Sequence, residues 1–221
     1  MMPGLVSRAH AGSPEAVARR RFGLWSLVVF VLLLPPWWLW GADILLAMLR
    51  PLAAVALQAV GLTGQITTGP DGAWVVGTPL TQGGQPVTYT VPHTALRRLV
   101  LGFPLAIAFL TAPPRTLQPI RAVVVSLVVL TMVFLASLAA LIWGDLAAQL
   151  NPELATTRHD SLASLDQPPL HPVLSQVAIV GRYVGMSIAP LIAAILLWAA
   201  LNPRGRALVM DDTTLKAQDE A

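Results

Sequence analysis

The side chains best suited to chemistry in this chain are charged groups set within apolar sequence. Arg182 stands in the run VAIVGRYVGMSIAP, and Asp145 follows the apolar run that ends at Trp143. A charge at membrane depth is costly, so it is usually paired or functional. We expect Arg182 either to reach the interface or pair with Asp145, or to bind a ligand in the membrane.

A second constellation comprises His93, Arg97 and Arg98, where a polar segment returns to apolar sequence. Cations at this position commonly contact headgroup phosphates. The same residues could also form a cationic pocket for an anionic lipid or for an acidic segment of a partner protein. The sequence leaves both interpretations open.

Enzymatic and cofactor chemistry has little support in the sequence. The chain has no cysteine, which excludes thiolate catalysis and cysteine metal sites. His93, His159 and His171 come from separate segments without paired spacing, so no metal site is predicted. The run from Gly185 to Ala189 lacks the second glycine of a nucleophile elbow and lies in helical sequence. We therefore predict neither catalytic residues nor a cofactor.

The element that organises the rest of the chain is Ala122 to Trp143, an apolar run without a charge. About twenty such residues cross a hydrocarbon layer of about 30 Å as a helix. A helix also satisfies its own backbone hydrogen bonds there. The sequence therefore predicts a membrane-spanning helix.

Other apolar runs predict the remaining spans. We expect them at Phe22 to Trp40, with Pro35 and Pro36 kinking or ending the helix; at Ala95 to Ala112; and at Gln176 to Leu201, with Pro190 inside. The stretch Gly41 to Gly61 repeats leucines at helical spacing but contains Asp43 and Arg50. We expect it to be an interfacial or re-entrant helix.

The segment 62–94 changes character, being rich in Gly, Pro and Thr. Short alternating runs at 65–68, 73–78 and 86–91 predict three strands, with turns at Gly69 to Gly72 and at Gly83-Gly84. Such a small meander cannot hold a core by itself. It must lean on the membrane surface, on the preceding helix or on a partner.

Composition and charge bias agree with a membrane protein. Of the 221 residues 55% are hydrophobic and only 11% charged, against about 25% charged in soluble domains. The arginines lie at the ends of apolar runs, which favours headgroup anchoring over nucleic-acid binding. More arginines lie on one side of the predicted spans than on the other, which predicts cytoplasmic tails at 1–21 and 202–221 and an extracytoplasmic β-region. The segment 95–201 then holds three spans, with an external loop at 146–175. The fold class is an all-α integral membrane protein with about four spans and that small β-meander.

The order of these features resembles a known family. An arginine-headed span ending in Trp and Pro precedes Leu49-Arg50-Pro51-Leu52; a small β-region and Gly102-Phe103-Pro104-Leu105-Ala106 then follow. This pattern, over residues 20–145, is similar to the exosortase H-associated membrane proteins. The resemblance implies an accessory of a protein-sorting system in the bacterial inner membrane. Exosortases are cysteine transpeptidases, and without a cysteine this chain inherits no catalytic role.

The sequence thus favours a non-enzymatic accessory or scaffold that partners a membrane protein, such as an exosortase, and contacts lipids. The alternative is a subunit of a small transporter or channel with Arg182 in the ligand path. A third reading is a small membrane enzyme that uses histidine and arginine at the outer face. Binding by Arg182, Asp145, Arg97, Arg98 and His93 is the corresponding site prediction.

Overall fold

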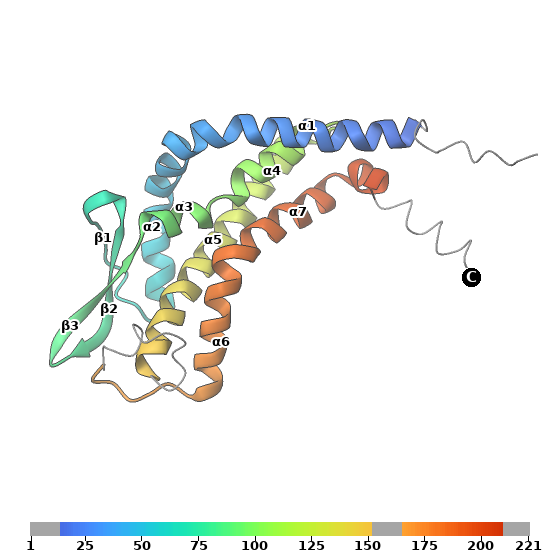
Figure 1. Cartoon of the computed structure of the whole chain (residues 1–221). Helices are drawn as coiled ribbons and strands as arrows, with labels where there is room; N and C mark the ends of the chain where they lie inside the picture. Colours follow the sequence, from blue (N-terminus) through green and yellow to red (C-terminus); the bar gives the residue numbers. More distant parts are fainter. Residues whose placement is uncertain (1–13, 152–164, 210–221) are drawn as a thin grey trace, which may run out of the picture.

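The chain folds into helices that carry a small antiparallel sheet at one end (Figure 1). This computed structural model describes residues 14–151 and 165–209. Residues 1–13 of the predicted N-terminal tail, residues 152–164 of the predicted external loop, which include His159, and the acidic tail from residue 210 lie outside the described residues. The described helices confirm the expected class: three are long and apolar enough to cross a membrane, or four if one bent pair counts as a span.

The chain begins with two helices joined without a break. Helix α1 (Pro14–Pro36) passes through a π-helical turn, Trp37–Gly41, into α2 (Ala42–Ala59). Figure 1 shows the two helices at a steep angle. A proline lacks the N–H that would donate a helical hydrogen bond. A π-helical turn next to the missing bond lets the helix continue with a bend. The expected kink at Pro35 and Pro36 is therefore present, and Gly41 to Gly61 is largely helical as predicted.

The second predicted span is broken near its start. Helix α3 (His93–Leu99) and helix α4 (Gly102–Thr111) are separated at Val100 and Leu101. Pro104 cannot donate to the carbonyl of Val100, and the N–H of Phe103 takes that acceptor instead at 3.2 Å. Such tighter turns are common where a helix is interrupted. α3 packs against α2 and α5 on the far side of this break.

Helix α5 (Pro119–Leu150) is the longest element and runs through the middle of the bundle (Figure 1). Its 32 residues span about 48 Å at 1.5 Å per residue. It contains the predicted span Ala122 to Trp143 and continues beyond it. Asp145 lies in this continuation, beyond the helix length that is needed to cross the hydrocarbon core.

The last predicted span bends sharply. Helix α6 (Pro172–Tyr183), the π-helical turn Val184–Ile188 and helix α7 (Ala189–Leu201) follow one another, and α6 and α7 meet at 62°. Pro190 removes a backbone donor at this point, which explains the bend. α6 runs beside α5, and α7 diverges toward the start of α1 (Figure 1).

The predicted meander is a three-stranded antiparallel sheet in the order β1-β2-β3. Its strands are β1 (Ile66–Thr68), β2 (Trp74–Gln82) and β3 (Gln85–Val91). Gln82 pairs with Gln85 across a two-residue turn in which Gly83 and Gly84 have φ of 57° and 77°. Glycine adopts these left-handed angles without strain, as the sequence predicted for this turn.

The sheet leans on the helices rather than standing alone. Val76 and Val91 are fully buried, and the ring of Trp74 meets Phe134 of α5 edge to face at 6.2 Å between centroids. These side chains belong to one apolar core together with α2. The sequence left three possible supports for the sheet: the membrane surface, the preceding helix or a partner. The structure shows that the preceding helix, α2, supports the sheet, and that α5 does so as well.

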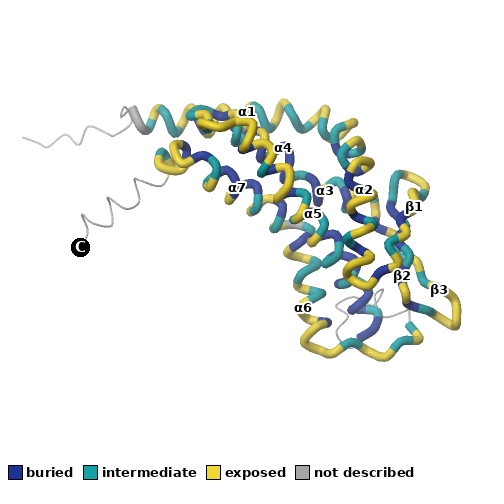
Figure 2. Tube along the Cα trace, turned by 180° about the vertical axis from the view of Figure 1, so that it is seen from behind, coloured by how far each residue is buried: buried dark blue, intermediate teal, exposed yellow. Residues whose placement is uncertain are grey.

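The outer surfaces of the helices are strongly apolar. Figure 2 shows exposed residues along α1 and α6. Leu32 of α1 and Leu196 of α7 are 68% and 63% exposed. Apolar patches of this extent are unusual on soluble monomers. They fit a chain whose solvent is lipid.

Close packing of α5 on α6 depends on Gly144. A Cβ at this position would lie 2.6 Å from Cβ of Arg182 and 2.7 Å from the carbonyl oxygen of Ala178. Small residues allow helix backbones to approach in membranes. Gly144 therefore sets the distance at which Arg182 meets α5.

We predict that Gly144→Ala destabilises the protein by about 1–3 kcal/mol, because the added methyl group overpacks the helix contact. Thermal unfolding in detergent micelles measures the change. Gly23→Ala is the matched control, since a Cβ there meets no atom within 4 Å. Equal melting temperatures for the two variants would contradict the packing role of Gly144.

Candidate functional site

The first charged cluster joins α2 to α3 through Asp43. Arg97 donates to its carboxylate from Nη2 at 2.6 Å and from Nε at 3.2 Å, and His93 Nε2 lies 2.7 Å from Oδ1. Residues four apart share one face of a helix, so α3 presents the side chains of His93 and Arg97 to a single carboxylate. We call these three residues the Asp43 cluster.

The surroundings of the Asp43 cluster hold its members in place. The guanidinium carbon of Arg97 lies 5.5 Å from the ring centroid of Trp38, within the range of a cation–π contact. Arg50 lies further along α2 than Asp43. It donates to the hydroxyl of Thr68 at 2.7 Å and to the carbonyl of Ile66 at 2.9 Å. Together these bonds fasten α2 to α3 and to strand β1.

A shallow pocket lies beside the Asp43 cluster. It has a volume of about 430 Å³, and its lining includes Asp43, Arg50, Asp71 and His93. Its charges are of both signs, so it has no clear preference for an anion or a cation. Arg98, the neighbour of Arg97, is exposed and takes no part in the contacts described for this cluster.

The second cluster centres on Asp145 of α5. Arg182 of α6 forms an ion pair with its carboxylate, and Tyr89 of β3 donates a hydroxyl to the other carboxylate oxygen. Arg182 also donates to the hydroxyl of Tyr183 at 2.7 Å. The Arg182 and Asp145 side chains are only 15% and 24% exposed. We call Asp145, Arg182 and Tyr89 the Asp145 cluster.

A third acidic contact closes the tip of the sheet. Asp166 accepts the N–H of Gly83 at 3.0 Å and that of Gly84 at 2.9 Å, and its own N–H donates to the carbonyl of Thr81 at 2.9 Å. The two glycine N–H groups, Gly84 first, hold the pKa of Asp166 below its usual value near 3.8, because they favour the ionised carboxylate. The segment before α6 is thereby bonded to the hairpin.

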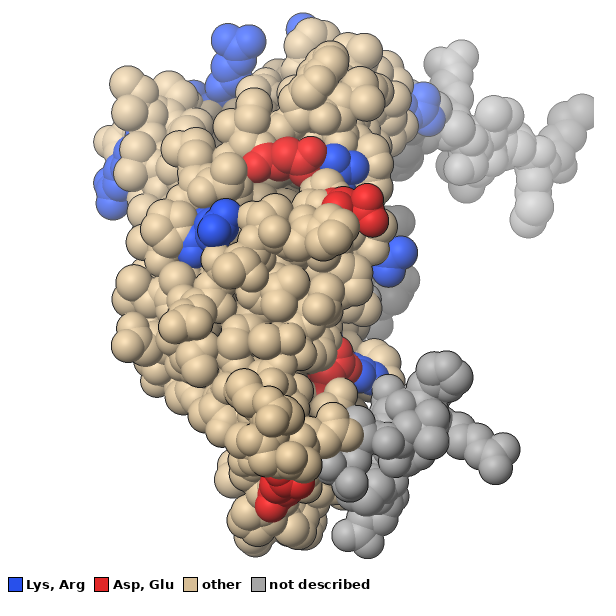
Figure 3. Space-filling model, turned by 90° about the vertical axis from the view of Figure 1, so that its left-hand side faces the viewer, with Lys and Arg blue, Asp and Glu red and all other residues tan. Residues whose placement is uncertain are grey.

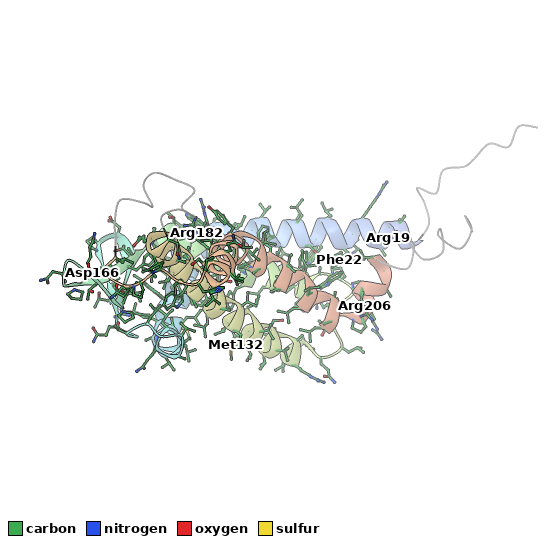
Figure 4. All side chains as sticks on the ribbon, turned by 90° about the horizontal axis from the view of Figure 1, so that it is seen from below. Arg19, Phe22, Met132, Asp166, Arg182 and Arg206 are labelled. Atoms are coloured by element: carbon green, nitrogen blue, oxygen red, sulfur yellow. The ribbon has the colours of Figure 1, made fainter. Side chains whose placement is uncertain are left out.

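These contacts bring together most of the predicted site residues, in two separate groups. Asp145 and Arg182 are paired, one of the alternatives that the sequence left open, while Arg97 and His93 meet on Asp43. Figure 4 shows Arg182 toward the end of the molecule that carries Asp166. Figure 3 shows acidic patches beside basic ones on a mostly uncharged surface. The arrangement neutralises charge and fixes helix and strand positions.

Sequence reasoning missed the acceptor Asp43 and the donor Tyr89. In the sequence alone, Asp43 is only an interruption of an apolar stretch, and Tyr89 is one residue of a predicted strand. A usable signal existed for Asp43, since His93 and Arg97 at helical spacing place an imidazole and a guanidinium on one face, where a carboxylate can bond to both. For Tyr89 no local signal exists, because its partner lies 56 residues away.

The fold and its paired charges define a multi-span helical membrane protein with a small anchored sheet. A family model, the exosortase H-associated membrane protein, matches residues 16–205, and the chain belongs to this family. The match extends beyond the 20–145 resemblance and takes in α6 and α7. No curated protein and no solved structure matches the chain.

We predict that Asp145→Asn or Arg182→Gln alone destabilises the protein by about 1–3 kcal/mol, because each leaves a mostly buried charge without its partner. The double variant should lose less than the sum of the two, with a coupling of at least about 1 kcal/mol. Thermal unfolding in micelles measures the cycle. Arg98→Gln, at an exposed position, should change stability by less than about 0.5 kcal/mol. Additive losses would contradict the pairing.

We predict that Gly83 and Gly84 report the titration of Asp166. Their amide proton shifts should stay constant above the usual carboxyl pKa and change as the pH falls through a midpoint below 3.8, because protonation weakens both acceptors. The contribution of Asp166 to stability is therefore present at neutral pH and lost in acid. Glycine-selective NMR in micelles measures this, and Asp166→Asn should abolish the titration. A midpoint at or above 3.8 would contradict it.

Proposed function

We propose that this protein is a non-enzymatic accessory of an exosortase H system, which binds the exosortase in the bacterial inner membrane. The family match over residues 16–205 carries this proposal. In this proposal, the helices hold the sheet on the extracytoplasmic side of the membrane, and the exosortase binds the protein there. Both termini are then cytoplasmic.

The way in which charges are used supports a scaffold. Asp43, Asp145 and Asp166 each accept hydrogen bonds that tie one element to another. A sheet held in this way has a fixed position relative to the helices, which lowers the entropic cost of binding a partner. Strand β3 is also at an edge of the described sheet, and its Thr88 and Thr90 are exposed. Edge strands are common docking sites for extended segments.

The arrangement of the described ends supports a common side for both termini. The ring of Phe22 near the start of α1 stacks on Trp198 near the end of α7, with 5.0 Å between centroids. The arginine bias of the sequence then favours the cytoplasmic side.

The pairing of Arg182 supports the accessory over the transporter alternative. A ligand-binding arginine in a transport path must exchange partners, and here the guanidinium is engaged by Asp145 and by Tyr183. Arg182→Gln separates the two functions: it would change solute flux in proteoliposomes for a transporter, and leave any flux at background for an accessory.

We predict that the protein co-purifies with its own organism's exosortase H in near-equal amounts from mild detergent. Thr88→Glu, at the exposed edge of β3, should reduce recovery of the exosortase about tenfold, since an unmatched charge at an interface centre costs more than 1 kcal/mol. Ala207→Glu adds the same charge at an exposed position after α7, at the other end of the molecule, and should leave recovery unchanged.

Tagged co-expression with quantitative mass spectrometry measures these recoveries. Recovery of the protein only as a homo-oligomer would overturn the accessory role. A purified sample that turns over a substrate and loses that activity on His93→Asn would support the enzyme reading instead.

A further inference from the structure

An arginine-lined pocket lies at the end of the bundle opposite the sheet. It is formed where the connection between α4 and α5 meets the end of α7, and it has a volume of about 290 Å³. Arg115, Arg121 and Arg204 are among its lining residues. Figure 4 shows this end, marked by Arg206, far from Asp166.

The charge of this pocket differs from that of the two clusters. Arg97 and Arg182 each bind a carboxylate, whereas among the described residues the side chains of the pocket arginines make a single hydrogen bond, from Arg121 to the side-chain oxygen of Gln118 at 3.2 Å. Within residues 14–151 and 165–209, no acidic side chain lines the pocket or pairs with its arginines. Guanidinium groups match the geometry and charge of phosphate. The pocket therefore favours a phosphate-bearing anion.

The wall of the pocket is built into the fold. Asn202 is completely buried; its Nδ2 donates to the carbonyl of Pro114 at 2.8 Å, and its Oδ1 accepts the N–H of Gly205 at 3.0 Å. These bonds join the connection before α5 to the end of α7. The arginines therefore stand on backbone whose position is already fixed, which reduces the cost of binding.

An apolar groove adjoins the arginines. It has a volume of about 540 Å³, shares Gln118 and Arg121 with the pocket, and continues over Ile120 and Val124 of α5. Ile120 is 80% exposed and Val124 53%. Because α5 is a candidate span, its start lies at the membrane interface, with this groove directed along the hydrocarbon.

We propose that this pocket and groove bind one anionic phospholipid, with the headgroup phosphate on Arg115, Arg121 and Arg204 and an acyl chain along the start of α5. A cationic pocket directly beside an apolar groove matches a ligand that is both charged and oily. Basic pockets between membrane helices bind anionic headgroups in this way. The site is independent of the exosortase partnership.

The test is native mass spectrometry of the full chain in detergent, titrated with phosphatidylglycerol, phosphatidylcholine or inorganic phosphate. We expect phosphatidylglycerol to bind more tightly than phosphatidylcholine. Arg115→Gln/Arg204→Gln should weaken it by about 25-fold, at about fivefold for each arginine. The control Arg20→Gln/Arg206→Gln removes the same charge outside the pocket and should weaken it less than about twofold.

Several outcomes would overturn the site. Equal loss in the two double variants would mean that general surface charge attracts the lipid. Displacement by inorganic phosphate at the same concentration would mean a free-phosphate site. Binding of phosphatidylglycerol only after removal of residues 210–221 would mean that the acidic tail occupies the arginines. If the pocket variant elutes as aggregate, Arg204→Gln alone against Arg206→Gln gives the same comparison.

Discussion

The carboxylate of Asp145 is the contact on which the arrangement of this protein depends. It receives Arg182 from α6 and Tyr89 from β3, so one side chain of α5 joins two helices and the sheet. The contact is possible because Gly144 lets α6 approach closely. At a site shielded from water the attraction is strong, and an unpaired charge is correspondingly costly. The sheet and the last helices are therefore fixed relative to α5 by the same group.

The two ends of the molecule use charge in opposite ways. At the sheet end, carboxylates are bonded to side chains of neighbouring elements, as in the Asp43 cluster. These bonds fix the helices and the strands relative to one another. At the other end, the aromatic rings of Phe22, Phe109 and Trp198 hold the helices together. Charge is then not needed for cohesion there. Arg115 and Arg204 are left to act outward, which agrees with a membrane-surface role.

The predictable features are those encoded in short stretches of sequence. Ala122 to Trp143 lies within a single helix because an apolar run of that length has few other stable states, and Gly83-Gly84 forms the turn that its backbone freedom allows. The sequence left open whether Pro35 and Pro36 kink or end the helix, since the π turn that accommodates them depends on the packing of Trp37 against Gly41. The pairing of Tyr89 with Asp145 was equally hidden, because no local pattern links the two residues. Their pairing is determined by the tertiary fold.

The length of α5 connects these observations to the bilayer. Asp145 lies 26 residues beyond Pro119, the first residue of α5, which is about 39 Å along an upright helix. The hydrocarbon core is about 30 Å thick. If the arginine pocket sits at one headgroup layer, Asp145 and its ion pair reach the opposite headgroup layer, where paired charges are tolerated. Tyr89 of β3, which bonds to Asp145, then stands at the membrane surface, at a height set by α5, whereas Trp74 packs deeper against Phe134. In the proposed accessory role, this fixed height would place the sheet at a constant level for a membrane-embedded partner, and one helix would set it.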